Sequence, residues 1–319
     1  MRYDSGRSRI RAFVPAAAGT LAVFVLVSMC GLPGCSDGNA TGTLKVLITD
    51  SPYPFEYISE AWVTVTRVEV HHVGDVDEDA EADGLDAPET IEGEDEEESD
   101  ADGDSPWIVI FEGEREFNLM NLRNGRTDLL AGAELPAGHY NQMRLIVTQG
   151  YVVLTDGREF MLTVPSGEQT GIKLHYPFDV GYERSETTLL LDVDMSRAFK
   201  PSPNGGINEA SDIEGFRFTP SLAMRLIDLL EAGSISGTVT DGDGLALESA
   251  TVIVFADGDE ISTTTTETDG TYMLIGLPTG SYAVGFSAGG YSGAEENEVE
   301  VSAGETTSGI DAVLETSGG

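Results

Sequence analysis

Hydrophobic and polar residues alternate in short runs along most of this chain. Between Ala61 and Val70, valines stand at positions 63, 65, 68 and 70, with threonine and charged residues among them. Such alternation places one face of a strand against a core and the other toward water. The spacing slips by one residue between Val65 and Val68, which predicts a β-bulge at that point.

Further segments with the same alternation predict an all-β first domain over residues 43–230. Residues 151–154 and 159–164 flank the turn Asp156-Gly157, and together they predict a β-hairpin. The segment Phe216–Leu226 predicts a last strand, which Pro220 places at a sheet edge or a bulge. The other predicted strands span residues 44–48, 107–111, 140–147, 172–176 and 187–193. No stretch of the chain predicts a long helix.

From Ser234 onward, turn signals become dense and the strands between them become short. Asp-Gly pairs occur at 241–242, 257–258 and 269–270. Short strands with a turn signal every 8–12 residues or so are typical of a small β-sandwich. The pattern therefore predicts an all-β protein with two β-sandwich-like domains, at residues 43–230 and 233–315. No internal repeat relates the two.

Residues 75–104 depart from this pattern, because they contain 17 Asp or Glu and no Lys or Arg. Their only large apolar residues are Val76, Leu85 and Ile91. Such a segment cannot bury enough apolar surface to offset the entropy lost on ordering. Because the strand pattern resumes at Trp107, we predict a long disordered acidic loop inserted within the first domain.

The charge of the chain narrows the choice of partners. Its 319 residues include 56 acidic and 17 basic ones, which gives a formal net charge of -39. Binding to nucleic acid needs clustered Lys and Arg, so we expect no nucleic-acid partner. The two cysteines, Cys30 and Cys35, both lie near the N-terminus and leave the rest of the chain without thiol chemistry.

The first 35 residues form a targeting signal. Four arginines precede an apolar run over residues 13–29, which is typical of a secretory signal and short for a transmembrane helix. The run is followed by Leu32-Pro33-Gly34-Cys35, which resembles a bacterial lipobox. The resemblance implies a signal peptide over 1–34, lipidation of Cys35 and a short tether over 35–42. A plain secretory signal with an incidental cysteine is the alternative.

Anchoring by lipid would place the protein in the cell envelope with the membrane as its first partner. In enterobacteria, Asp directly after the lipidated cysteine favours retention in the inner membrane. This chain has Ser36 at that position, so by analogy the outer membrane is favoured. Whether the protein faces the periplasm or the cell surface stays open. Cys30 is a poorer lipidation candidate, because the large residue Met29 precedes it.

Candidate catalytic groups are sparse. The histidines are His71, His72, His139 and His175. His71 and His72 are adjacent, so on a strand they face opposite sides and cannot chelate one ion together. Asp192 and Asp194 alternate onto one strand face, where acid–base chemistry is conceivable, but so acidic a chain produces such pairs by chance. Ser166 lacks the strand–turn–helix context of a nucleophile, and we expect no enzyme activity.

Calcium is the strongest ionic candidate, because alternating aspartates supply hard oxygen ligands. The weak candidate ligands are Asp75, Asp77, Asp79, Asp100, Asp102 and Asp104. The second run has Ser105 and Phe111 where an EF-hand loop needs glycine and a carboxylate, so it is not an EF-hand. Loosely bound calcium and a purely solvated loop remain alternatives, and no other cofactor is expected.

The second domain resembles a carboxypeptidase regulatory-like domain, a prealbumin-like β-sandwich, over about 233–315. The resemblance rests on Gly233 to Asp241, Thr268-Asp-Gly-Thr-Tyr272 and Gly276-Leu-Pro-Thr-Gly-Ser-Tyr282, in that order. It implies a β-sandwich with an accessory role and no peptidase chemistry.

Residues 43–230 resemble the DUF4382 family of bacterial and archaeal lipoproteins. The matching stretches include Gly42 to Pro52, Val63 to Val68, Leu135-Pro-Ala-Gly-His-Tyr140 and Thr170 to Leu174. The acidic insertion is longer than the family pattern needs. The family has no established activity, so the resemblance implies architecture without a mechanism.

These observations predict a non-catalytic, lipid-anchored envelope protein. Its first domain would be a binding or structural module, and its second an accessory β-sandwich. An unknown envelope protein or polysaccharide is the expected partner. Two alternatives stay open: a calcium-dependent surface adhesin that uses the acidic loop, and a hydrolase of envelope polymers.

Overall fold

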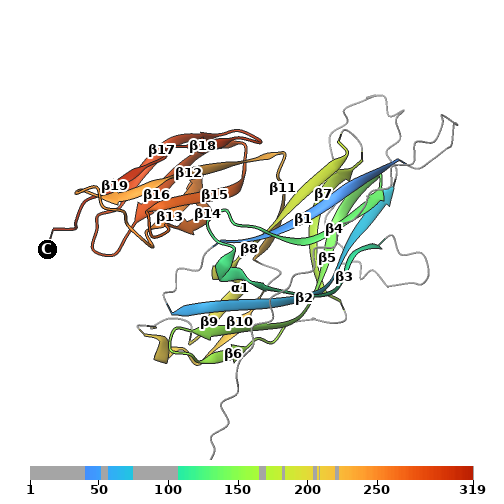
Figure 1. The fold of residues 1–319 in the computed structure, drawn as a ribbon, viewed down its shortest axis with the longest axis horizontal. Coiled ribbons are helices and arrows are strands. Elements are labelled where there is room, and N and C mark those ends of the chain that lie inside the picture. The colour runs from blue at the N-terminus through green and yellow to red at the C-terminus, as the bar shows by residue number, and fades with distance from the viewer. Residues whose placement is uncertain are drawn as a thin grey trace, which may run out of the picture. The chain divides into compact units, whose positions relative to one another are not determined.

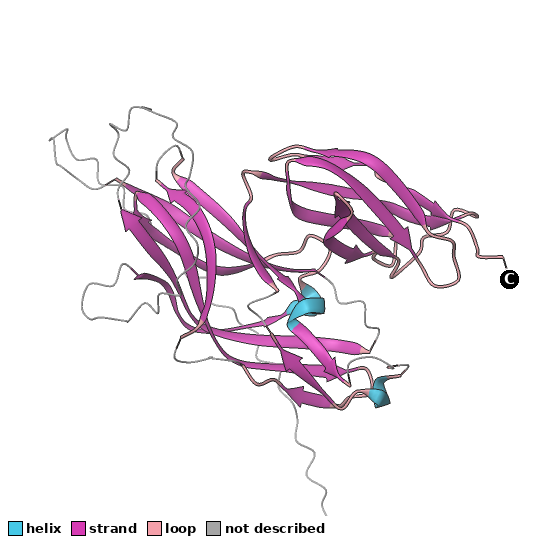
Figure 2. Ribbon diagram, turned by 180° about the vertical axis from the view of Figure 1, so that it is seen from behind, coloured by secondary structure: helices cyan, strands magenta, loops and turns pink. Residues whose placement is uncertain are grey.

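The computed structural model describes residues 40–51, 57–74, 107–164, 170–181, 184–203, 207, 209–219 and 223–318. Strands are the main secondary structure of this described part and helices are few and short, as Figure 2 shows, so the prediction of an all-β protein is confirmed. No helix in the described ranges is long and apolar enough to cross a membrane. The predicted signal peptide and the acidic segment 75–104 lie outside the described residues.

The first sheet of the first domain has the strand order β11-β8-β1-β4 (Figure 1). Its strands are β1 (Thr41–Ser51), β4 (Asp128–Pro136), β8 (Glu186–Asp194) and β11 (Met224–Asp228). β1 lies in the middle, antiparallel to β4 and parallel to β8. As in other strands buried on both faces, β8 shows a continuous apolar run, from Leu189 to Leu191, in place of strict alternation.

The second sheet runs β3-β2-β5, and β6 and β7 both pair with β5. Its strands are β2 (Ile58–Gly74), β3 (Trp107–Asn118), β5 (Gly138–Leu154), β6 (Glu159–Met161) and β7 (Ile172–Val180). β5 and β6 form the predicted hairpin. The register of β2 against β3 shifts between Val65 and Arg67, so the predicted bulge is also confirmed.

The two sheets share one hydrophobic core, which makes the first domain a β-sandwich. The alternating residues Val63, Val65, Val68 and Val70 of β2 are each at most 3% exposed and belong to the same cluster as residues of β1 and β8. Burial of a valine side chain stabilises a fold by about 1.5–3 kcal/mol. The one-residue slip therefore returns the later valines to the core face, as a bulge allows.

The prediction of one strand over Phe216–Leu226 was wrong. β10 (Gly215–Phe218) pairs with β9 (Phe199–Ser202) in a separate two-stranded ribbon, whereas β11 joins β8. In the sequence, the proline at position 220 falls between these two strands, which is consistent with its inability to donate to a ladder. The described helices are short: α1 (Met195–Ala198), η1 (Leu119–Asn121) and η2 (Ala210–Asp212).

The second domain is likewise a sandwich around its own core. One sheet contains β12 (Ala232–Asp241), β15 (Thr271–Pro278), β18 (Thr306–Ser308) and β19 (Ala312–Leu314). The other contains β13 (Thr251–Ala256), β14 (Asp259–Thr265), β16 (Gly280–Ser287) and β17 (Ala294–Val301). The core cluster includes Ile235, Val254 and Val284, all fully buried. The sequence pattern missed β18 and β19, because each has only three residues.

One six-residue pattern, Leu-Pro-x-Gly-x-Tyr, occurs in both domains at the same structural place. In the first domain it joins β4 to β5, and in the second it joins β15 to β16, so both copies carry the chain from one sheet to the other. Tyr140 donates a hydrogen bond to the carbonyl of Pro136 at 2.9 Å, and Tyr282 donates to the carbonyl of Pro278 at 2.6 Å. Both domains therefore tie this crossing by the same bond.

Replacing Tyr140 by phenylalanine should destabilise the first domain by about 0.5–1.5 kcal/mol, because the partly buried carbonyl of Pro136 loses its donor while the ring stays packed. Urea unfolding followed by tryptophan fluorescence measures this, since both tryptophans, Trp62 and Trp107, lie in the first domain. Tyr291→Phe, in the second domain, is the matched control. Identical unfolding midpoints for both variants and the unsubstituted protein would contradict the role given to the bond.

Candidate functional site

Most residues that the sequence singled out for chemistry lie outside the described residues. They are Cys30, Cys35, Ser166 and the six calcium candidates Asp75, Asp77, Asp79, Asp100, Asp102 and Asp104. Within the described ranges, no group of three or more His, Cys, Asp or Glu is placed to hold a metal ion. The lipidation and calcium predictions therefore stay predictions.

The carboxylates of Asp192 and Asp194 take structural roles. Asp192 is 5% exposed, and its Oδ2 lies 2.8 Å from the guanidinium of Arg225 on the neighbouring strand β11. Asp194 caps the N-terminus of α1, where it accepts hydrogen bonds from the main chain of Arg197 and the hydroxyl of Ser196. Neither arrangement resembles a pair of carboxylates poised for acid–base catalysis.

A third carboxyl beside them, Asp50 at the end of β1, was not singled out by the sequence. It is 5% exposed, and its burial raises its pKa well above the ordinary range. The negative charges of Asp192 and Asp194 raise the pKa further, whereas Arg123 and the main chain of Met195 lower it by less. The fold therefore favours the protonated form of the Asp50 carboxyl more than water does.

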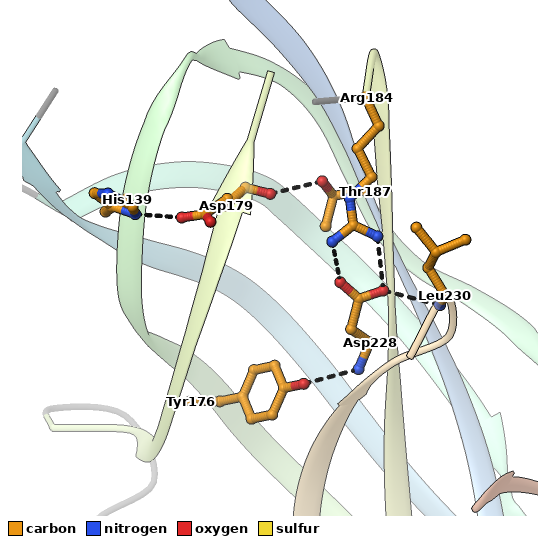
Figure 3. Close-up of polar contacts among 7 residues, drawn as sticks. All are labelled: His139, Tyr176, Asp179, Arg184, Thr187, Asp228 and Leu230. Carbon is orange, nitrogen blue, oxygen red and sulfur yellow. Dashed lines mark hydrogen bonds and ion pairs between the residues drawn. The ribbon is translucent and has the colours of Figure 1, made fainter. Parts of the chain in front are cut away.

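A hollow of the first domain lies where the edge strands of its two sheets meet. It has a volume of about 440 Å³ and is lined mainly by β7, by the start of β5 and by the end of β11. Its lining includes His139, Tyr176, Phe178, Asp179, Arg184, Asp228 and Glu231. We call it the edge hollow. Figure 3 shows its polar contacts.

A buried ion pair forms one wall of the edge hollow. Both guanidinium nitrogens of Arg184 meet the carboxylate of Asp228, in the fork geometry that favours arginine over lysine. The Asp228 side chain is 4% exposed and also accepts a hydrogen bond from the main-chain amide of Leu230 at 2.9 Å. This carboxylate is therefore fully engaged by the framework.

Tyr176 connects the two sheets across the edge hollow. Its hydroxyl oxygen, on β7, accepts a hydrogen bond from the main-chain N–H of Asp228, on β11, at 3.0 Å (Figure 3). The N–H of an edge strand otherwise faces solvent. Burial raises the pKa of Tyr176, and the nearby charge of Glu231 raises it further, so the phenol stays neutral at physiological pH.

His139 and Asp179 face each other across the β5–β7 ladder and form a second polar pair. Both side chains are about half exposed, at 50% and 51%. The main-chain carbonyl of Asp179 accepts a hydrogen bond from the hydroxyl of Thr187 at 2.7 Å, which fixes this end of β7 against β8. Among the described lining residues of the hollow there is no serine or cysteine.

Aromatic rings form the floor of the edge hollow. Tyr140 and Phe178 stack with their ring centroids 5.3 Å apart, and His72 packs against Tyr140 at 4.9 Å. Tyr140 also donates the hydrogen bond to Pro136 that ties the crossing between the sheets, so this bond fixes the position of its ring in the hollow.

The histidines are dispersed over this domain. His71 lies on the opposite face of β2 from His72, where it contacts Trp107 and Asn141, and His175 is exposed on β7. This confirms that His71 and His72 point to opposite sides. Sequence reasoning missed the edge hollow, since its residues come from distant segments and no local motif joins them. The position of His139 within the Leu-Pro-x-Gly-x-Tyr pattern was the only signal in the sequence.

Comparisons with known proteins identify the two domains. The profile of DUF4382, a domain of unknown function, matches residues 41–208, and that of a carboxypeptidase regulatory-like domain matches residues 234–315. Both resemblances proposed from the sequence, and their order, are thus confirmed. No curated protein matches the chain.

Solved structures match only distantly. The Bacillus anthracis TIE protein is 12% identical with a TM-score of 0.23, over 89% of this chain and 42% of that chain. A DUF3823 family protein from Parabacteroides merdae is 20% identical with a TM-score of 0.20, over 27% and 46%. GBS52, the minor pilin of Streptococcus agalactiae, is 12% identical with a TM-score of 0.23, over 86% and 97%. The chain spans less than half the length of the first two, and at these TM-scores none defines its function.

The raised pKa of Asp50 leads to a prediction about pH. A proton held in the fold and lost on unfolding makes stability fall as pH rises above about 4, by up to about 1.4 kcal/mol per pH unit. Asp50→Asn, which keeps the shape without the proton, should remove this fall. Urea unfolding between pH 4.5 and 7.5 measures it, with exposed Asp243→Asn as control. A constant difference between Asp50→Asn and the unsubstituted protein across this range would show that Asp50 is ionised in the fold.

Proposed function

Because the chain belongs to the DUF4382 family, with a carboxypeptidase regulatory-like domain after it, we propose that it is a non-catalytic, lipid-anchored binding protein of the cell envelope. Its first domain is the binding or structural module, and the second is an accessory sandwich. The partner is an envelope protein or polysaccharide, not nucleic acid.

The edge hollow is the observation that carries the binding role. It is concave, partly aromatic and bordered by fixed polar groups, and its volume of about 440 Å³ lies within the range of small-molecule sites, roughly 300–1,000 Å³. The buried carboxylate of Asp228 is neutralised by Arg184 and held by the main-chain amide of Leu230. A framework of this kind supports binding better than proton transfer, which requires a group free to change its charge.

The anchor rests on the sequence around Cys35. The cysteine follows Leu32-Pro33-Gly34 at the end of an apolar signal, and residues 35–42 then provide a short polar tether. Acyl chains stabilise membrane attachment by about 0.8 kcal/mol per buried methylene, and two or more chains hold a protein stably. The net charge of -39 argues against electrostatic docking on an anionic membrane. Attachment by lipid does not depend on that charge. The outer membrane is the proposed location.

Cys35→Ala should abolish acylation, because the only other cysteine, Cys30, lies within the predicted signal peptide over 1–34. Metabolic labelling of cells with an alkyne fatty acid, followed by gel detection, measures this directly. Cys30→Ala is the matched control and should keep its label, since Cys30 lies within the region that is removed. Equal labelling of Cys35→Ala and the unsubstituted protein would overturn the proposed anchor.

A further inference from the structure

We infer that the edge hollow binds a protonated amine carried on a small or flexible apolar body. The inference rests on the binding role proposed above and names the ligand chemistry of that same site. Three features of the hollow carry it: its net charge, its aromatic lining and the fixed geometry of its walls.

The edge hollow carries a net negative charge. Its ion pair between Arg184 and Asp228 is neutral as a unit, so it contributes little. The remaining ionisable groups are the carboxylates of Asp179 and Glu231 and the imidazole of His139. Two carboxylates outweigh one imidazole in either of its protonation states. An anionic ligand would therefore meet repulsion, and the net charge of -39 also enriches cations around the protein.

Aromatic rings supply the second half of an ammonium site. Tyr176 lines the hollow and is partly exposed, and the buried, stacked pair Tyr140 and Phe178 belongs to the same lining. The face of an aromatic ring such as that of Tyr176 attracts organic cations, while apolar ring surface accepts the methylene groups beside an ammonium. Neutral alcohols would gain from the second contribution only.

The walls are held in place without a ligand. Tyr176 is fixed through the N–H of Asp228, and Asp228 is fixed by Arg184 and by the amide of Leu230. Asp179 is held by its bond to His139 and by Thr187. Preorganised walls lower the entropy lost on binding, so a small ligand can be retained.

A metal ion fits this site less well than an amine does. Calcium and magnesium prefer six or more oxygen ligands, or water in their place, whereas much of this lining is aromatic. The described residues also contain no group of three side chains placed to coordinate a metal. An organic cation uses both the carboxylates and the rings.

The test is isothermal titration calorimetry on the full-length protein in detergent, with pentylamine as the probe and 1-pentanol as its neutral counterpart. Pentylamine carries one charge, which limits its attraction to the many other carboxylates of the chain. We expect pentylamine to bind and 1-pentanol to bind at least tenfold more weakly. Nα-acetyl-lysine amide and glucosamine, as further arms, distinguish a peptide side chain from an amino sugar as the source of the amine.

Two substitutions locate the binding. Glu231→Gln and Asp179→Asn should each weaken pentylamine binding at least fivefold, and both side chains are exposed enough to be replaced without unfolding the domain. Glu248→Gln removes an exposed carboxylate in the second domain and should leave binding unchanged.

Equal binding of pentylamine and 1-pentanol would overturn the inference, and so would equal losses in Glu231→Gln and Glu248→Gln, which would show diffuse attraction. Fatty-acid labelling of the same preparation separates this outcome from failure of the proposed function. A protein that carries the fatty-acid label but does not bind pentylamine would refute the ligand class alone. An unlabelled protein that binds them would refute the anchor alone.

Discussion

The chain of a β-sandwich must pass from one sheet to the other, and in this protein a tyrosine fixes that passage in each domain. Tyr140 and Tyr282 each return a hydrogen bond to the proline carbonyl four residues earlier. The bond gives the proline carbonyl a donor, and it holds the tyrosine ring at the crossing. In the first domain that same ring is the floor of the edge hollow. The hydrogen bond of Tyr140 therefore fixes the crossing between the two sheets, and the same residue belongs to the lining of the edge hollow.

A sandwich is open at its edges, and this one closes an edge with side chains. β7 and β11 are edge strands of different sheets, and no ladder joins them. The hydroxyl oxygen of Tyr176 accepts a hydrogen bond from the outward-facing main-chain N–H of Asp228, while Arg184 neutralises the Asp228 carboxylate. Removing any one of these partners would leave a buried polar group unsatisfied. The result is a preformed concavity in place of an exposed strand edge, which is a usual site of aggregation.

The sequence was sufficient for the features that depend on short-range pattern. Alternation in β2 predicted both the strand and its bulge, and the Asp156-Gly157 turn predicted the β5–β6 hairpin. The split of residues 216–226 into β10 and β11 was not predictable, because it depends on which strand each half pairs with. The edge hollow was equally hidden, since His139, Tyr176, Arg184 and Asp228 meet only after the sheets have formed. Likewise, Asp50 reads as an ordinary strand-end aspartate until its burial is known.

The central claim is that the edge of the first domain is closed into a rigid hollow before any ligand arrives. Hydrogen exchange at the main-chain amide of Asp228, observed by NMR in the unliganded protein, tests it most directly. The account predicts that this amide exchanges as slowly as the amides of the central strand β5, although β11 is an edge strand, because its N–H is held by Tyr176. Exchange at the rate of a solvent-exposed edge amide would contradict the claim.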